Sequence, residues 1–371
     1  MNLNSYMPVK LVTGAGCVRA GGKELAKLGS RCLIVTGRNS ARACGALQDM
    51  TDTLDENGQQ WTVFDEIGQN PQLTDCMRAA QRAIEDRTDF IVGIGGGSAL
   101  DAAKCIAVLS ANPDMTQEQL YAFQWANAPL KIVAVGTTAG TGSEVTKVSV
   151  ITTPDGRKKS FHHEAIFPVL AFGDPSYTMT VAPMVTRATM VDVLAHCAES
   201  FFSRSANHIS RCYAAEGIRL LLPVFRRIAA QGCDILDYNT REQLYCASIY
   251  GGLAINVTGT CFPHTMGYLL TEHFGVPHGT ACAVFQQDFY EHNKSVDPQL
   301  AAQFLERIGC DEAEYLRLIA LLTPPCDITM DESLIAASHS RWVGNGSFAK
   351  TPGNFTPDMA DEVLRRKFLA R

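Results

Sequence analysis

The segment FIVGIGGGSALDAAK, residues 90–104, changes character at its glycines. Its first four residues are an apolar run typical of a buried strand, and the alanine-rich stretch 99–110 predicts a helix. Glycines between a strand and a helix let the backbone approach a phosphate, whose charge is stabilised by the helix N-terminus. The segment therefore predicts a strand, a glycine turn and a helix, and the turn is either an ordinary tight turn or part of a phosphate site.

A second glycine turn follows another short apolar run. Residues 131–135 (KIVAV) predict a strand, and the next nine residues (GTTAGTGSE, 136–144) hold three glycines and four hydroxyl side chains. Hydroxyls and uncovered backbone amides suit the oxygens of phosphate and ribose. Because ligands of open α/β sheets bind at the carboxyl ends of strands, we expect both turns to belong to one nucleotide site.

Short apolar runs and amphipathic stretches alternate through the first half of the chain, as in βαβ units around a parallel sheet. Further strands are expected at 32–36 and 60–64, and further helices at 47–57 and 74–85. Asp101 and Lys104, one turn apart on the predicted helix after the first glycine turn, suggest a surface ion pair.

The second half has a different pattern, which begins near Pro183. There apolar residues recur every three or four positions, which predicts long helices. The clearest helical windows are 186–202, 209–230 and 241–257. We expect a loop at 342–356 before a charged C-terminal helix. The predicted fold is an α/β domain over 1–180 followed by an all-α domain over 181–371.

Composition narrows the class of protein further. The 371 residues are 46% apolar and 19% charged, enough for one or two substantial cores. With 32 basic against 38 acidic residues and no dominant block of charge, nucleic acid and anionic membranes are poor partners. The thirteen cysteines include no CxxC pair, which favours reduced thiols over disulfides. The first twenty residues lack the pattern of a signal peptide, so we expect a cytoplasmic protein.

The turn after the first predicted strand bears on the choice of nucleotide. Residues 35–40 (VTGRNS) contain no acidic side chain that could bind a ribose 2′-hydroxyl. Gly37 leaves room for a 2′-phosphate, and Arg38 and Ser40 supply donors. This favours NADP(H) over NAD(H), unless Arg38 is an ordinary surface residue.

A set of metal donors lies in the helical half. Asp192 and His196 are spaced four residues apart, so one face of a helix would present both. His264 and His278 come later in the chain. One carboxylate and three imidazoles suit Fe²⁺ or Zn²⁺ better than Mg²⁺ or Ca²⁺, although any single histidine could be structural.

These motifs together resemble the iron-containing (group III) alcohol dehydrogenase family. The resemblance rests on GGGSALDAAK, TTAGTGSEVT, the Asp192–His196 pair, and His264 followed fourteen residues later by His278. Within the family the chain is most similar to the short-chain alcohol and 1,3-propanediol dehydrogenases. The resemblance implies a Rossmann-like first domain, a helical second domain, and a cleft between them for NAD(P) and one divalent metal. It implies four metal ligands: Asp192, His196, His264 and His278.

The resemblance also implies residues that bind the cofactor. Gly96, Gly97 and Ser98 would lie at the pyrophosphate, and Asp101 beside the nicotinamide amide or its turn. The remaining positions are Thr137, Thr138 and Ser143 on the ribose and nicotinamide side, Lys158 or its neighbour Lys159 at the ribose, and Asn70 near the adenine ribose.

One position departs from the family pattern. Many members have a second histidine four residues after the third ligand, whereas this chain has Tyr268 there. Either the tyrosine hydroxyl takes part in proton transfer, or protons leave through the cofactor ribose and water. His273 is a further candidate for this place.

The predicted function is metal-dependent, NAD(P)-linked interconversion of a small primary alcohol and its aldehyde, by a homodimer. The alternatives are a dehydroquinate synthase-like enzyme, which shares the two-domain architecture, and a glycerol dehydrogenase-like enzyme. A polyanionic substrate needs basic residues near the metal, but apolar residues such as Leu194, Phe262 and Met266 surround the donors in sequence. The sequence does not choose the substrate, whose pocket we expect to involve Lys147, Ser149, Phe161 and the 342–355 loop, nor does it choose between iron and zinc.

Overall fold

The computed structural model describes residues 3 and 5–369, which divide into two compact units. The α/β unit consists of Met7–Ala182 together with Leu236–Tyr245. The helical unit holds Pro183–Ile235, the described residues from Cys246 onward and those before Met7. The segment Leu236–Tyr245 therefore belongs with the α/β unit although it lies in the C-terminal half of the sequence.

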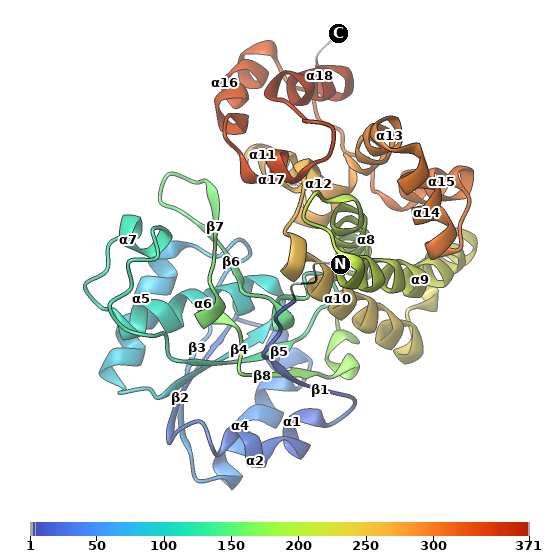
Figure 1. Cartoon of the computed structure of the whole chain (residues 1–371). Coiled ribbons are helices and arrows are strands. Elements are labelled where there is room, and N and C mark those ends of the chain that lie inside the picture. The colour runs from blue at the N-terminus through green and yellow to red at the C-terminus, as the bar shows by residue number, and fades with distance from the viewer. Residues whose placement is uncertain (1–2, 4, 370–371) are drawn as a thin grey trace. The chain divides into compact units, whose positions relative to one another are not determined.

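A six-stranded parallel sheet forms the centre of the α/β unit, with the strand order β1-β8-β5-β4-β2-β3 (Figure 1). Its strands are β1 (Lys10–Thr13), β2 (Arg31–Thr36), β3 (Gln60–Phe64), β4 (Phe90–Gly95), β5 (Lys131–Gly136) and β8 (Leu170–Gly173). Every residue of β4 is buried, as expected for a central parallel strand covered on both faces. The predicted α/β class is confirmed, and four strands lie where the sequence places them.

Helices cover both faces of the sheet. Successive residues of β2 point to opposite sides, so Leu33 and Val35 pack in one core and Cys32 and Ile34 in another. The first core lies on one face of the sheet and the second on the other, and Figure 1 shows helices along both faces. The helices are α5 (Leu73–Glu85) and α6 (Gly97–Ala111) on the first face, and α1 (Cys17–Ala20), α2 (Gly22–Leu25) and α4 (Ala46–Glu56) on the second.

Smaller elements complete the α/β unit. An antiparallel hairpin of β6 (Val148–Thr152) and β7 (Lys158–His162) follows the second glycine turn. The short helices α3 (Ser40–Ala43) and α7 (Gln117–Tyr121) lie in connections between strands. The sequence predicts neither the hairpin nor the strands β1 and β8.

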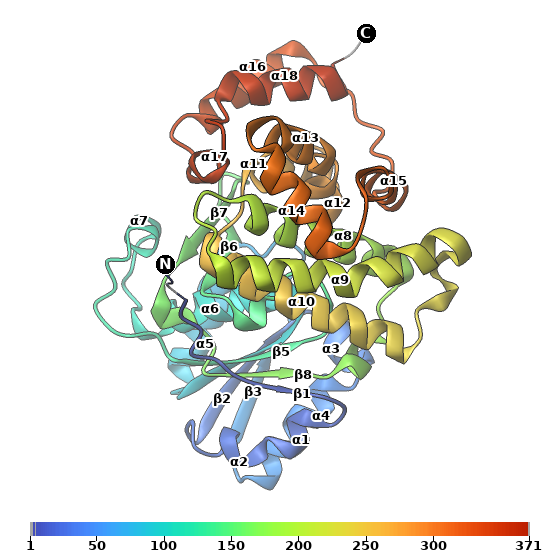
Figure 2. The same ribbon diagram turned by 45° about the vertical axis from the view of Figure 1, so that its right-hand side comes forward.

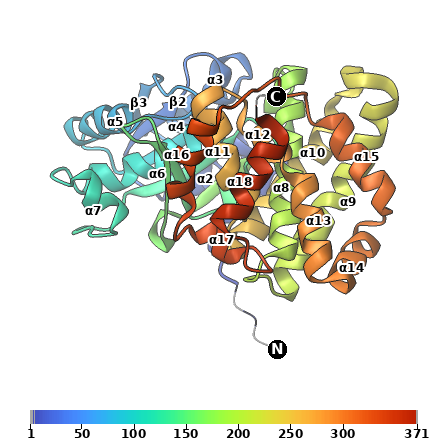
Figure 3. The ribbon, with the colours of Figure 1, turned by 90° about the horizontal axis from the view of Figure 1, so that it is seen from above.

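The helical unit is built around α8 (Pro183–Phe202), whose residues after Thr189 are all buried. It packs along α9 (His208–Gln231), as seen in Figure 3. The other helices are α10 (Tyr238–Thr258), whose residues up to Tyr245 belong to the α/β unit, α11 (Phe262–Phe274), α12 (His278–Ala283), α13 (Gln286–Val296), α14 (Pro298–Ile308), α15 (Glu312–Leu322), α16 (Glu332–Trp342), α17 (Gly346–Lys350) and α18 (Pro357–Phe368). The all-helical second half is therefore confirmed.

The C-terminal part of this unit corrects one prediction. Figure 2 shows α16 and α18 side by side, and α18 is the expected charged helix. The stretch 342–356, predicted as a loop, contains the helix α17. Asn345 caps this helix by accepting a hydrogen bond from the Ser347 N–H, and the buried Phe348 anchors it. Among the described residues, no helix has the length and apolar character needed to cross a membrane.

Candidate functional site

Three polar turns lie at one edge of the sheet in the α/β unit. They follow β2, β4 and β5, which are neighbours in the strand order and run parallel. The turn after β2 holds Gly37 and the exposed Ser40, the turn after β4 holds the first glycine cluster, and the turn after β5 holds Thr137 and Thr138. The carboxyl ends of adjacent parallel strands are where such folds bind nucleotides.

The two glycine turns pack closely against each other. A Cβ atom on Gly97 would lie 2.6 Å from Thr141 Cγ2, and one on Gly96 would lie 2.9 Å from Thr138 Oγ1. Only glycine permits this approach. Gly96 is also the N-cap of α6 and supplies no side-chain hydrogen bond to the first turn of the helix. A helix N-terminus of this kind suits a phosphate.

Three residues predicted to bind the nucleotide meet beside this helix start. The Asn70 backbone N–H donates to Ser98 Oγ at 3.3 Å, and Lys158 Nζ donates to Asn70 Oδ1 at 3.0 Å. Asn70 has a φ of +56°, a conformation that asparagine tolerates better than most residues. The fold therefore joins three segments far apart in sequence and places an ammonium group near the glycine turn.

Lys104 is buried, and the predicted surface ion pair is wrong. Its side chain is 0% exposed, because the turn after β5 folds over α6. Its Nζ lies 2.8 Å from Ser143 O, 2.6 Å from Ser143 Oγ, 3.2 Å from Thr146 Oγ1 and 2.8 Å from Val148 O. Burial lowers the pKa of Lys104 to about 8, although Asp101 and Glu144 oppose the shift. The ammonium group thus ties the second glycine turn to α6.

Asp101 holds the same turn from the other side. Its Oδ1 accepts from Ser143 Oγ at 2.6 Å and its Oδ2 from the Val150 N–H at 3.0 Å. Burial raises the pKa of Asp101, against the lowering effect of Lys104. Both Asp101 and Ser143 are therefore engaged in fixing the turn, and their contacts with a cofactor stay predictions.

A second buried carboxylate, Glu144, connects the second glycine turn to α10 by a hydrogen bond. Its Oε1 accepts from the Tyr245 hydroxyl at 2.7 Å. A Cβ atom on Gly136 would lie 1.8 Å from the same Oε1, so this pair needs a glycine at the end of β5. Burial raises the pKa of Glu144, and the tyrosine hydroxyl opposes the shift.

We predict that Tyr245→Phe lowers the free energy of unfolding by about 1–3 kcal/mol, because a buried carboxylate loses its donor. Urea unfolding measures the change. Tyr177→Phe is the matched control, since its hydroxyl donates to Asp49, whose side chain is 29% exposed and can be solvated. An equal loss of unfolding free energy in both variants would show that the burial of Glu144 does not increase the cost of losing its donor.

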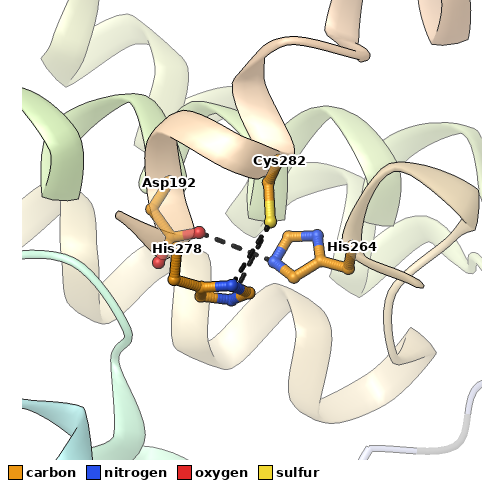
Figure 4. Close-up of side chains that lie close together, drawn as sticks. All are labelled: Asp192, His264, His278 and Cys282. Atoms are coloured by element: carbon orange, nitrogen blue, oxygen red, sulfur yellow. Dashed lines mark hydrogen bonds and ion pairs between the residues drawn. The ribbon is translucent and has the colours of Figure 1, made fainter. Parts of the chain in front are cut away.

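Three of the four predicted metal donors, Asp192, His264 and His278, come together in the helical unit (Figure 4), and His196 lies next to them. Asp192 and His196 lie on α8, His264 on α11, and His278 begins α12. Asp192 Oδ1 is 3.6 Å from His264 Nε2 and 3.9 Å from His196 Nε2. Ligand atoms of Asp192, His264, His278 and Cys282 all lie within 4.8 Å of one another. His196 stacks on His264 with 4.7 Å between ring centroids.

Two buried atoms of this cluster have the surroundings and the separation that two ligands of one metal ion would have. Within the described part of the chain, Asp192 Oδ1 and His264 Nε2 have no hydrogen-bond partner. Their separation of 3.6 Å is too long for a hydrogen bond. Two ligands on one tetrahedral ion with bonds near 2.1 Å lie about 3.4 Å apart. Burial would raise the pKa of Asp192, but His196, His278 and His264 outweigh it and lower the pKa, which keeps the carboxylate ionised.

Sequence reasoning missed two members of the cluster. Glu199 accepts a hydrogen bond from His264 Nδ1 at 2.7 Å, and its place on α8, seven residues after Asp192, puts both on one helix face. Cys282 lies one turn after His278, with its Sγ 3.7 Å from Nδ1 and 3.8 Å from Nε2 of that ring. The helical spacing from a predicted ligand was the available signal in both cases.

The two candidates for proton transfer have different surroundings. The Tyr268 ring stacks on the His278 ring with 5.4 Å between centroids and 22° between planes. His273 is exposed on α11. Tyr268 is therefore the candidate that lies beside a donor of the cluster.

The expectation for the substrate pocket needs correction. Phe161 is buried in the core of the α/β unit, where its ring packs against Tyr121 and Trp125. Ser149 is buried and donates to Asp101 O, and Trp342 is buried against Phe348. Phe161 and Trp342 therefore pack against other rings, and Ser149 is held by its hydrogen bond to α6.

Comparison with known proteins gives one consistent family. Residues 8–175 match the family "Iron-containing alcohol dehydrogenase", and residues 186–322 match the C-terminal domain of the Fe-containing alcohol dehydrogenase family. The chain is 30% identical to a 1,3-propanediol dehydrogenase of Klebsiella pneumoniae over 83% of this chain and 78% of that protein.

Solved structures agree with this family in both sequence and fold. An iron-containing alcohol dehydrogenase from Thermotoga maritima is 32% identical, with a TM-score of 0.89 over 98% of each chain. A sulfoacetaldehyde reductase from Bifidobacterium kashiwanohense, solved in complex with NAD⁺, is 28% identical, with a TM-score of 0.86 over 99% of this chain and 98% of that one.

Proposed function

Because the chain belongs to the iron-containing alcohol dehydrogenase family, a family of NAD(P)-dependent oxidoreductases, we propose that it interconverts a small primary alcohol and its aldehyde. The observation that carries the proposal is a pair of buried atoms, Asp192 Oδ1 and His264 Nε2, which lie 3.6 Å apart near His278 and have no hydrogen-bond partner among the residues that the structure describes. A structural histidine cluster would hydrogen-bond these atoms to each other or to a neighbour.

Asp192, His196, His264 and His278 would hold the metal. When bound, a divalent cation supplies Lewis acidity toward a substrate oxygen, and the nicotinamide supplies or accepts the hydride. The chain's own part is to keep the donors fixed in a buried site and to keep Asp192 ionised. Tyr268, stacked on His278, is the proposed group for moving a proton to or from the substrate oxygen.

The cofactor would bind at the glycine turns of the α/β unit. Gly96, Gly97 and Ser98 would face the pyrophosphate, and Lys158 and Asn70 a ribose. The uncapped start of α6 and the nearby ammonium group support an anionic ligand there. The Bifidobacterium reductase binds NAD⁺, whereas we propose a preference for NADP(H) in this chain because of Arg38.

We expect Arg38→Ala to lower kcat/KM with NADPH about tenfold while kcat/KM with NADH stays unchanged, as the loss of one charge-assisted hydrogen bond to a 2′-phosphate predicts. Steady-state kinetics with both cofactors measure the ratio. Arg42→Ala is the control, since Arg42 is similarly exposed but pairs with Asp65. An unchanged ratio in the Arg38 variant would remove the basis for the NADP(H) preference.

A panel of aldehydes tests the proposed function. The metal-free protein is loaded separately with Fe²⁺ and Zn²⁺, and each form is assayed with NADH and NADPH on propanal, 3-hydroxypropanal, butanal, lactaldehyde and a charged aldehyde. We expect loss of nicotinamide absorbance with at least one aldehyde in a metal-loaded form and none in the metal-free form. Turnover that does not depend on metal would contradict the proposal. Light scattering on the same samples tests the proposed homodimer.

A further inference from the structure

We infer that Glu199 is a positioning residue that aims His264 at the metal. Its side chain is 0% exposed and accepts three hydrogen bonds. His264 Nδ1 approaches Oε1 at 2.7 Å, Gln286 Nε2 donates to Oε1 at 2.9 Å, and the Cys261 N–H donates to Oε2 at 2.8 Å. The inference rests on the proposed metal-dependent function and assigns a role to a residue outside the donor set.

The contact with His264 decides which ring nitrogen is available. A carboxylate only accepts hydrogen bonds, so Nδ1 must carry the proton in this contact. In a neutral ring, Nε2 then keeps its lone pair. Nε2 is the atom that lies 3.6 Å from Asp192 Oδ1 and has no hydrogen-bond partner in the described part of the chain. Glu199 thus selects the tautomer that a ligand at this place needs.

Glu199 also fixes the relative register of two donor helices. It lies seven residues after Asp192 and three after His196, on the same face of α8. Its Oε2 accepts a hydrogen bond from the backbone N–H of Cys261, the N-cap residue of α11, whose own side chain makes no capping hydrogen bond. His264 lies in the first turn of α11. One carboxylate therefore connects the helix of Asp192 to the helix of His264.

Charge gives a second reason for the assignment. Asp192 and Glu199 are two buried carboxylates on one helix. Within the described residues, neither forms an ion pair with a lysine or an arginine, and their ion-pair contacts are with histidines. Buried carboxylates without a cation are costly. A divalent cation would balance the two negative charges.

The test compares Glu199→Gln with a matched variant. Glutamine keeps the size of the side chain but removes the charge and one acceptor. The probe is Zn²⁺ alone, with its Kd measured by competition against a chromophoric chelator. We expect Glu199→Gln to weaken Zn²⁺ binding about 10–100-fold, as for other partners that orient metal ligands. The visible spectrum of the Co²⁺-loaded protein should shift, because the ligand geometry changes.

Glu272→Gln is the matched control. Glu272 is a 7% exposed glutamate of the same helical unit that accepts a hydrogen bond from Arg341 Nη2 at 2.6 Å, and neither residue belongs to the groups of possible metal donors among the described residues. We expect the control to retain the wild-type Kd for Zn²⁺ even where its stability falls. Wild-type affinity and an unchanged Co²⁺ spectrum in Glu199→Gln would overturn the inference while leaving the proposed function intact. Failure of the wild-type protein to bind Zn²⁺ or Fe²⁺ would instead overturn both.

A measurement on the wild-type protein covers the case in which Glu199→Gln does not fold. In the Zn²⁺-loaded protein with ¹⁵N-labelled histidine, the ring nitrogens of His264 report the tautomer directly by NMR. We expect a protonated Nδ1 and a metal-bound Nε2. Metal at Nδ1 would overturn the inference.

Discussion

Asp192→Asn is expected to lower kcat/KM at least about a thousandfold and to leave the purified protein without stoichiometric metal. The variant keeps the shape of the side chain, so α8 and its packing should survive. It replaces an anionic ligand, whose Oδ1 has no hydrogen-bond partner among the described residues, with a neutral amide. Metal analysis, circular dichroism and steady-state kinetics on one preparation separate loss of metal from loss of fold.

Asp288→Asn is the control for this variant. Asp288 is also buried in the helical unit, but its carboxylate pairs with Arg366 and Lys367. We expect this control to lose stability and to keep its metal and its activity per folded protein. An Asp192→Asn protein that lacks metal and still turns over at the wild-type rate would refute the metal-dependent mechanism.

Lys104→Met is the second change with a large expected effect, this time on stability. Methionine has a similar length, but the variant removes the hydrogen bonds that Lys104 donates to four oxygens and removes the cation 3.7 Å from Asp101. Breaking a buried charge network by removing one member costs about 3–5 kcal/mol. We expect the free energy of unfolding of the α/β unit to fall by this amount. We also expect a higher KM for the cofactor.

Lys159→Met is the comparison for this prediction. Lys159 is an exposed lysine of the same unit, with its Nζ over the Tyr121 ring at 4.2 Å. Removing this ammonium group should lower the free energy of unfolding by less than about 1 kcal/mol. Urea unfolding followed by fluorescence measures both variants. A Lys104→Met protein as stable as Lys159→Met would show that the buried ammonium does not hold the glycine turn.

The parts of the fold that could be predicted from sequence depend on local patterns. The strands β2 to β5 are apolar runs beside turns, and α8 to α10 have apolar residues at helical spacing. The strands β1 and β8 have four residues each and pair with each other although about 160 positions separate them. Strand β1 is also partly exposed at the sheet edge, so it lacks an apolar run. Such long-range pairing leaves no local signal.

The site shows the same division between local and tertiary information. The i, i+4 pair of Asp192 and His196 is visible in the sequence, and the family resemblance adds His264 and His278. The burial of Lys104 could not be predicted, because a lysine three residues after an aspartate on a helix is typical of a surface pair. Only the packing of the second glycine turn over α6 buries it. Glu199 was missed because its role depends on a ring brought in by another helix.

The central claim is that a metal ion binds among Asp192, His196, His264 and His278. Anomalous X-ray diffraction, recorded on either side of the zinc absorption edge from crystals of the zinc-loaded protein, locates the ion directly. The account predicts one strong peak about 2.0–2.2 Å from Asp192 Oδ1 and His264 Nε2. A peak only at the separate group of His339, Asp358 and Asp361, or none in the helical unit, would contradict it.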